Sequence, residues 1–339
     1  MTTTPEGSKR IDTSAATPAP GAETAATVDL GTQIERALSA FVRGGNAAQE
    51  LIVLDRLYAA HPDAAQVEAT ARRLFAQPAA FDNLNFHSSL LTNGSQFFGL
   101  VLRKMGEIVD AEPALAEGAA LPVLIRLSEH FRRKGDLTQM EHFAARVEEQ
   151  LRERVQRNDT LALAQLAKVR YEQSMGYFTT KDFGRSISVG EESIGLCERA
   201  GDEFGVLAAR GNTAGLSRYE WARSLGPQDP KSAQLLQEGK PVLEADLLRA
   251  QERITQLAEH PGEREKFERV VMNNAIHLMH IADLLKDPEP AGRLKAILDV
   301  NPVFQKAFDP QHPGDPAHAQ AWAQVPSQIL ARLAAERQR

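Results

Sequence analysis

Between residues 121 and 155 apolar side chains recur with the period of an α-helix, and this pattern constrains the fold more than any other feature of the sequence. One stripe repeats at intervals of three and four residues. Its members are Met140, Phe143, Ala144, Val147 and Leu151. A second stripe, with Leu124 and Leu127, precedes it, and Lys134-Gly135-Asp136 separates the two. The pattern predicts two antiparallel helices joined by a tight turn, which form a helical hairpin.

Charged residues occupy the faces opposite these stripes, and we expect those faces to be solvated. They are Arg132, Arg133, Glu148, Glu149, Arg152 and Glu153. The short basic run Arg132-Arg133-Lys134 fits a helix C-terminus, where cations interact favourably with the helix dipole.

Apolar stripes of the same kind predict further helices throughout residues 31–287. The first two helices lie on either side of Gly44-Gly45-Asn46, and the second of them ends at His61-Pro62-Asp63. Two more are predicted at 64–76 and at 83–110, the latter with an interruption at Thr92-Asn93-Gly94. The remaining ones lie around 163–177, from Phe183 to a break at Gly201-Asp202, from Leu207 to about Trp221, at 232–258 and at 263–286. Ala and Leu dominate the composition, aromatic residues make up only 6%, and runs with a period of two are missing. The chain is therefore predicted to be all-α.

The two ends of the chain differ from its centre in composition. Residues 1–30 contain Ser, Thr, Ala and Pro with almost no large apolar side chain, so we predict a disordered tail that cannot offset its ordering entropy. Residues 288–339 are rich in proline, which forbids long helices. We expect a C-terminal extension there, with short helices at 291–299 and 327–338, that caps the last hairpin of a 31–287 repeat domain.

Two of the hairpins share a pattern in which a small residue is followed three residues later by an aromatic one, and then by a turn. Ser128 precedes Phe131 in the first hairpin. Ser174, 46 residues further on, precedes Tyr177, and Ala214 takes the same place 40 residues later. The small side chain lets the two helices of a pair approach closely, and the ring fills the gap beside it. A period near 40 residues predicts helical pairs stacked in succession.

These hairpins resemble the tetratricopeptide repeat family, in particular its branch with a longer period. The resemblance covers 120–225 well and 31–62 in part, and Pro62 stands where the family tends to end its second helix. The chain departs from the family at Lys181, where Gly is common, and at Met140, where Ala is common. The resemblance implies an α-solenoid of stacked antiparallel hairpins. Its concave surface, lined by the first helix of each pair, would bind another protein or a peptide.

The same resemblance supplies candidate partner-binding residues. Asn212 falls in a predicted first helix, where the family often uses Asn to hydrogen-bond a peptide backbone or carboxylate. The other candidates lie on first helices nearby and are Arg170, Gln173, Arg210 and Arg218. The alternative interpretation is that all five are ordinary surface residues.

Catalytic and metal-binding patterns are missing from the sequence. Cys197, the only cysteine, lies on an apolar helix face, and we expect it to be a small core residue. His277 and His280 share a helix face with Asp283 one turn on, but no further ligand can be named, so we predict no metal site. No glycine-rich phosphate loop of a known type occurs. We therefore predict no catalytic residue and no cofactor.

The composition also narrows the partners. The formal net charge is −6 and no basic stripe is present, which argues against nucleic acid. No apolar run approaches the roughly 20 residues that a membrane span needs. We expect a cytoplasmic scaffold or adaptor that binds a protein or peptide. Two alternatives stay open: a regulator that senses a ligand, and a bacterial effector, because the Ser/Thr/Ala/Pro-rich start resembles the export signal of type III secreted effectors. An enzyme is expected least.

Overall fold

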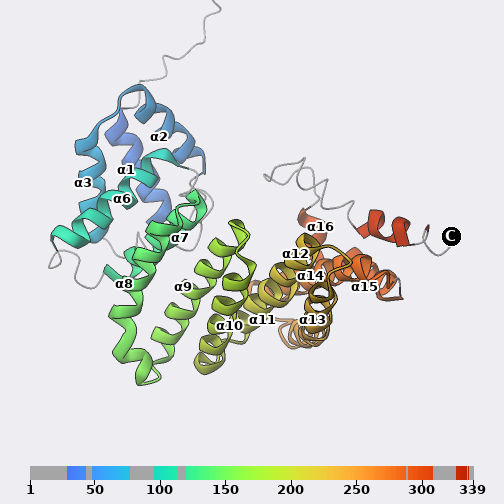
Figure 1. Cartoon of the computed structure of the whole chain (residues 1–339). Helices are drawn as coiled ribbons and strands as arrows, with labels where there is room; N and C mark the ends of the chain where they lie inside the picture. Colours follow the sequence, from blue (N-terminus) through green and yellow to red (C-terminus); the bar gives the residue numbers. More distant parts are fainter. Residues whose placement is uncertain are drawn as a thin grey trace, which may run out of the picture.

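The computed structural model describes residues 29–42, 48–76, 95–112, 120–287, 289–307, 326–333 and 335. Within these residues all regular secondary structure is helical, which confirms the all-α prediction (Figure 1). The first elements are α1 (Leu30–Val42), α2 (Ala48–Ala60), α3 (Ala64–Ala76), α6 (Gln96–Ala111), α7 (Ala120–Lys134), α8 (Leu137–Gln156), α9 (Thr160–Thr179) and α10 (Phe183–Ala200). They are followed by α11 (Glu203–Arg210), η1 (Gly211–Ser217), α12 (Arg218–Leu225), α13 (Pro230–Gln256), α14 (Pro261–Leu285), α15 (Glu289–Asp299) and α16 (Pro302–Ala307).

The four consecutive turns from α7 to α11 share one construction. In each turn a residue with φ between 56° and 74° ends a helix, and an aspartate directly after it caps the next helix. The pairs are Gly135-Asp136, Asn158-Asp159, Lys181-Asp182 and Gly201-Asp202. Each aspartate carboxylate accepts a hydrogen bond of 2.8–3.2 Å from the backbone N–H three residues later. The chain therefore reverses direction within two or three residues at every turn.

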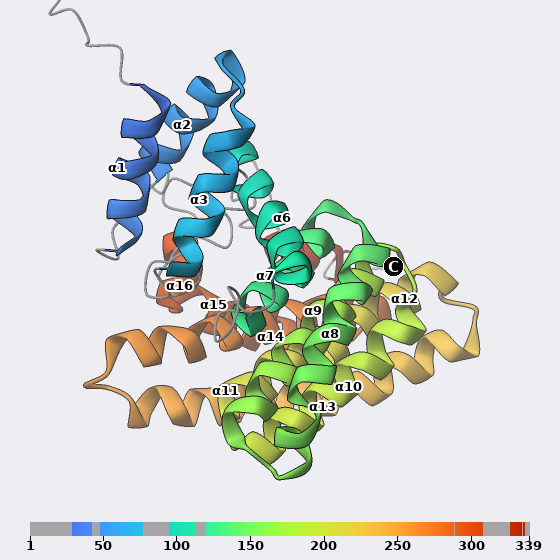
Figure 2. The same ribbon diagram turned by 90° about the vertical axis from the view of Figure 1, so that its left-hand side faces the viewer.

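Neighbouring helices pack in pairs, and small residues set their separation. In Figure 1 the helices α8, α9 and α10 lie side by side in chain order, and in Figure 2 the same helices overlap, one in front of another. The helix α7 contacts both α8 and α9. The hydroxyl of Ser128 on α7 donates to the carbonyl of Met140 on α8 at 3.3 Å, and Ser174 on α9 donates to the carbonyl of Ser186 on α10 at 2.7 Å. Both serines are buried, so the predicted role of a small residue at these two places is confirmed.

A π-helical segment interrupts the helix that follows α10. The helices α11 and α12 are continuous through η1, and η1 contacts α10, α13 and α14. Glycines allow the close approach: a Cβ at Gly239 of α13 would stand 2.4 Å from the carbonyl oxygen of Ala214 in η1. A Cβ at Gly215 would stand 2.8 Å from Cδ2 of His277 on α14. A π-bulge of this kind often marks a functional site.

Two hydrophobic clusters make up the core. The first joins helices α1 to α9 with the neighbouring ends of α10 and α11, and the second runs from α10 and α11 to the described C-terminal residues. The described parts of 288–339 pack on α14: Phe304, Ile329 and Leu333 belong to the second cluster, and Arg332 donates to Asp283 at 2.7 Å. None of the described helices combines the length and the hydropathy that a membrane crossing requires.

Several sequence predictions fall on residues that are not described. The predicted tail 1–30 lies outside the described residues except for Asp29 and Leu30. The predicted breaks at Gly44-Gly45-Asn46 and Thr92-Asn93-Gly94 lie outside them too.

Candidate functional site

Side chains of α9 connect it to a first helix on either side. Glu172 accepts a hydrogen bond from Arg132 of α7, and the Tyr171 hydroxyl accepts one from Nδ2 of Asn212 in η1. On its far side η1 contacts α14. The helices α7, α9, α11–η1 and α14 therefore follow one another, and we call the surface they form the first-helix face.

One half of the first-helix face, between α7 and α9, holds a cluster of paired charges. We call it the ion cluster, and its members are Arg126, Glu129, Arg132, Arg133 and Glu172. The side chain of Glu129 is only 4% exposed and pairs with Arg126 and, at 2.8 Å, with Arg133. The second carboxylate, Glu172, pairs with Arg132. Each of the two buried carboxylates thus has a guanidinium partner within the protein.

Burial and charge act in opposite directions on these carboxylates. Burial alone would raise the pKa of Glu129, but the nearby cations, Arg126 foremost, outweigh it and hold that pKa below its ordinary value. Burial dominates at Glu172 and raises its pKa despite Arg132. The prediction that Arg132 and Arg133 lie on a solvated face was wrong, because α9 packs against α7. The guanidinium group of Arg132 pairs with Glu172 of α9, and that of Arg133 pairs with Glu129.

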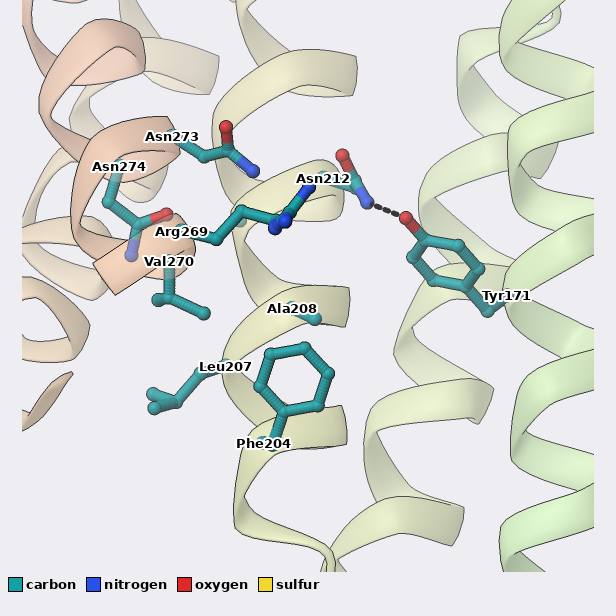
Figure 3. Close-up of a pocket in the computed structure, with 10 residues that line it drawn as sticks. Tyr171, Phe204, Leu207, Ala208, Asn212, Arg269, Val270, Asn273 and Asn274 are labelled. Carbon is teal, nitrogen blue, oxygen red and sulfur yellow. Dashed lines mark hydrogen bonds between the residues drawn. The ribbon is translucent and has the colours of Figure 1, made fainter. Parts of the chain in front are cut away.

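The other half, between α9, α11–η1 and α14, contains a pocket with a cavity volume of about 160 Å³ (Figure 3). We call it the amide pocket, and its lining is Tyr171, Phe204, Leu207, Ala208, Gly211, Asn212, Arg269, Val270, Asn273 and Asn274. Its lower part is apolar, with Phe204, Leu207 and Val270 (Figure 3). Its polar groups are mostly amides, and its one charged group, Arg269, already pairs with Glu265 at 3.1 Å.

Asn274 is the least ordinary residue of the amide pocket. Asn274 is 1% exposed, and neither Nδ2 nor Oδ1 of its side chain has a hydrogen-bond partner among the described residues. The Oδ1 atom lies against η1, since a Cβ at Gly211 would stand 2.8 Å from it. A buried carboxamide left without partners is costly, by about 1–3 kcal/mol for each unsatisfied group. Such a group needs a physical explanation, because nearly all buried polar groups in proteins have a partner.

Asn212 is the predicted residue that the structure places in the amide pocket. Its Nδ2 donates to the hydroxyl of Tyr171, which reaches across from α9 (Figure 3). Burial, and then the charge of Glu172, raise the pKa of Tyr171, so this hydroxyl stays protonated. Asn212 and the exposed Asn273 stand at the rim, on two neighbouring helices.

The other four predicted residues lie outside the lining of the pocket and have partners within the protein. Arg170 pairs with Glu148 at 2.8 Å and with Glu192 at 3.0 Å, and it donates to Gln173 at 2.8 Å. These contacts fasten α9 to α8 and α10.

Arg210 and Arg218, both on the helix that contains η1, also have acidic partners. Arg210 pairs with Glu198 at 2.7 Å and with Asp246 at 3.2 Å. Arg218 pairs with Glu191 at 2.9 Å. Arg218 also approaches Glu238 of α13 at 3.7 Å, so both arginines link this helix to α10 and to α13.

Sequence reasoning missed Tyr171, Asn273 and Asn274. A signal for Asn274 is present, because it lies three residues after Val271 and four after Val270, in register with the apolar stripe of α14. A polar residue in such a register is buried, and it then needs a partner.

His277 and Cys197 lie outside the lining of the amide pocket. His277 is buried against η1, and burial lowers its pKa to about 4. Cys197 is buried in the first hydrophobic cluster, as predicted, and burial raises its pKa to about 11. Among the described residues no group of three or more His, Cys, Asp or Glu side chains is arranged to hold a metal ion.

Comparisons of the chain with protein-family models, with curated proteins and with solved structures found no match. The function therefore has to be argued from the first-helix face itself, because a helical fold alone does not specify one.

Proposed function

We propose that this chain is a polypeptide-binding protein of the tetratricopeptide-repeat type, an α-solenoid that holds an extended segment of a partner along its first-helix face. The observation that carries the proposal is the amide pocket: three asparagines from two adjacent helices line it, and the buried one has no partner among the described residues. The repeated turn construction and the equivalent bonds of Ser128 and Ser174 support the solenoid, since they give successive hairpins the same geometry.

An extended polypeptide is the occupant that matches these groups. Its backbone presents an N–H donor and a C=O acceptor at every residue, and neither is used when the segment is not in a helix or sheet. A carboxamide offers a donor and an acceptor on one group, so Asn212 and Asn273 at the rim can each bond such a backbone. The apolar residues below, such as Leu207 and Val270, would bury one side chain of the segment.

The experiment selects peptides from a displayed random library on the wild-type chain and measures their affinity for variants. The double variant Asn212→Ala with Asn273→Ala removes both rim amides. If each bond contributes a net 0.5–1.5 kcal/mol, affinity falls by about 5- to 150-fold. The matched control is Gln139→Ala, which removes an exposed amide from α8, away from the first-helix face. A library that yields no peptide preferring the wild-type chain over the double variant would contradict the proposal.

A further inference from the structure

A cation beside the ion cluster has no partner of opposite charge. Lys168 is an exposed residue of α9, and no described residue forms an ion pair or a hydrogen bond with its ammonium group. We propose that Lys168 binds an acidic side chain of the partner segment, so that the segment carries a glutamate or aspartate a few residues from the side chain that enters the amide pocket. This inference rests on the proposed function and specifies a charge that the bound segment must carry.

The charges around Lys168 leave an excess of positive charge. The ion cluster has three arginines and two carboxylates, and both carboxylates pair with arginines of the cluster. The cluster alone therefore carries one positive charge, and Lys168 adds a second. Arg126 and Arg133 repel the ammonium group, and the two glutamates that attract it are already paired. A bound carboxylate would reduce this excess, whereas a bound cation would increase it.

Lys168 is open to a ligand, unlike the pairs beside it. The side chains of Arg126 and Glu129 are only 10% and 4% exposed, whereas Lys168 is an exposed residue. Burial, and then the charge of Arg126, nevertheless lower the pKa of Lys168. The ammonium group therefore has protein on several sides, and less water screens its charge than on an open surface. An anion that binds there is attracted more strongly than at an ordinary surface lysine, and it favours the charged form of Lys168.

The same segment can reach both Lys168 and the amide pocket. Lys168 precedes Tyr171, a residue of the pocket lining, by three positions, and residues three apart on a helix have Cβ atoms about 5–6 Å apart. The pocket lies on the other side of Tyr171, toward η1 and α14 (Figure 3). Neighbouring helices lie about 8–10 Å apart, and an extended chain advances about 3.3 Å per residue. We therefore expect the acidic residue about three positions from the side chain in the pocket.

The test uses synthetic ten-residue peptides with the full chain. Each peptide has one leucine for the amide pocket, and glutamate, glutamine or lysine three residues before or three residues after it, with serine and glycine elsewhere. Acetylated N-termini and amidated C-termini leave the varied residue as the only charge. We expect one of the two glutamate peptides to bind the wild-type chain about three- to tenfold more tightly than its glutamine counterpart at low salt. This ratio should fall toward one in 0.5 M NaCl, because salt screens the charges.

Two variants of Lys168 and a matched control test the assignment. Lys168→Ala removes the charge, so the ratio of glutamate to glutamine affinity should fall to about one. Lys168→Glu reverses the charge, so the lysine peptide should bind more tightly than it binds the wild-type chain. The control Arg152→Ala removes an exposed cation of α8 that also has no partner among the described residues, and the ratio should stay as in the wild-type chain.

The ratio is measured first on the wild-type chain, so the test does not depend on how well a variant folds. A glutamine peptide that binds the wild-type chain as tightly as the glutamate peptide would overturn the proposal. So would a ratio that falls as far in Arg152→Ala as in Lys168→Ala.

The outcomes separate this inference from the proposed function. If library peptides prefer the wild-type chain over the double variant of Asn212 and Asn273, but the synthetic peptides show no preference for glutamate, the acidic residue is wrong and the proposed function stands. If the glutamate preference depends on Lys168, but the double variant binds equally well and no library peptide is enriched, the role proposed for the amide pocket is wrong and the site at Lys168 stands.

Discussion

The two halves of the first-helix face treat buried polar groups in opposite ways. In the ion cluster every buried carboxylate has an arginine partner, and Glu129 has two. In the amide pocket the buried carboxamide of Asn274 has no partner among the described residues. Both halves share α9. Its residue Glu172 bonds Arg132 in the ion cluster, and the neighbouring Tyr171 bonds Asn212 in the amide pocket.

We infer from this difference that the ion cluster serves stability, and we assign the proposed binding function to the amide pocket. A polar group satisfied within the protein fixes the packing of the helices that carry it, and it has little left to offer a partner. A group left unsatisfied lowers the stability of the free protein, and a ligand that satisfies it recovers that free energy on binding. We therefore expect changes in the ion cluster to act on folding and changes in the amide pocket to act on binding.

The largest effect is expected from Glu129→Gln in the ion cluster. The change removes the negative charge that two arginines share, so the buried Arg126 and the half-buried Arg133 are left beside a neutral group. Breaking a buried pair by removing one partner lowers the free energy of unfolding by about 3–5 kcal/mol. Urea unfolding followed by circular dichroism measures it. The control Glu149→Gln, at an exposed position of α8, is expected to change stability by less than about 0.5 kcal/mol. Similar losses in the two variants would show that the cluster contributes little.

A smaller effect is expected from acid at His277, which lies beneath η1 in the other half. Burial, and then the neighbouring His280, lower the pKa of His277 to about 4, against about 6.5 in the unfolded chain. Between these values the unfolded state binds the extra proton, so stability is lost as the pH falls from about 6.5 to about 4. The loss is at most about 3 kcal/mol for this residue.

The measurement compares the pH dependence of stability in the wild-type chain and in His277→Leu. Removing one such histidine is expected to reduce the slope by up to about 1.4 kcal/mol per pH unit in this window. His130, in the α7 half, has its pKa lowered by burial to about 4 as well, so it stays as an internal reference in the variant. An unchanged slope would mean that His277 does not stay neutral in the folded protein.

A third test concerns the close contact between η1 and α13. Gly239→Ala would place a Cβ 2.4 Å from the Ala214 carbonyl oxygen, so the backbone must shift. Overpacking of this kind lowers stability by about 1–3 kcal/mol. The control is Gly195→Ala on α10, where a Cβ meets nothing within 4 Å and the same change is expected to stabilise the helix by about 0.5–1 kcal/mol. Peptide affinity should fall in the first variant only, because η1 carries Asn212. Equal stability in both variants would refute the tight packing.

The helices were largely predictable because their signals are local. The stripe from Met140 to Leu151 is buried as its period requires, and α3 has the predicted bounds. The turns at Gly135-Asp136 and Gly201-Asp202 are predictable from the sequence, whereas Asn158-Asp159 is not, because the left-handed residue is an asparagine within a charged run. The proline-rich composition of 288–339 does not predict α16, although the first position of a helix, which Pro302 occupies, tolerates proline.

The site was less predictable because it depends on which helices become neighbours. Arg132 and Arg133 have the spacing of a solvated face, and only the packing of α9 on α7 brings Glu172 to Arg132. Asn212 was reached through a family resemblance. Asn273 lies 61 residues further along the chain, and no local pattern places it beside η1. The register of Asn274 indicated burial, but its lack of a partner depends on the surrounding helices.

The smallest effect, and the sharpest test of the comparison, is expected from Tyr171→Phe at the boundary of the two halves. The hydroxyl accepts a hydrogen bond from Asn212, so its loss should lower stability by no more than about 1 kcal/mol. If the carboxamide of Asn212 contacts the bound peptide, Tyr171→Phe frees its Nδ2 donor, and peptide affinity should stay the same or rise by up to about tenfold. Asn212→Ala should lower peptide affinity. If Tyr171→Phe instead weakens binding as much as Asn212→Ala, the tyrosine must hold the amide in place. The amide half would then also depend on groups satisfied within the protein, and the contrast with the ion cluster would fail.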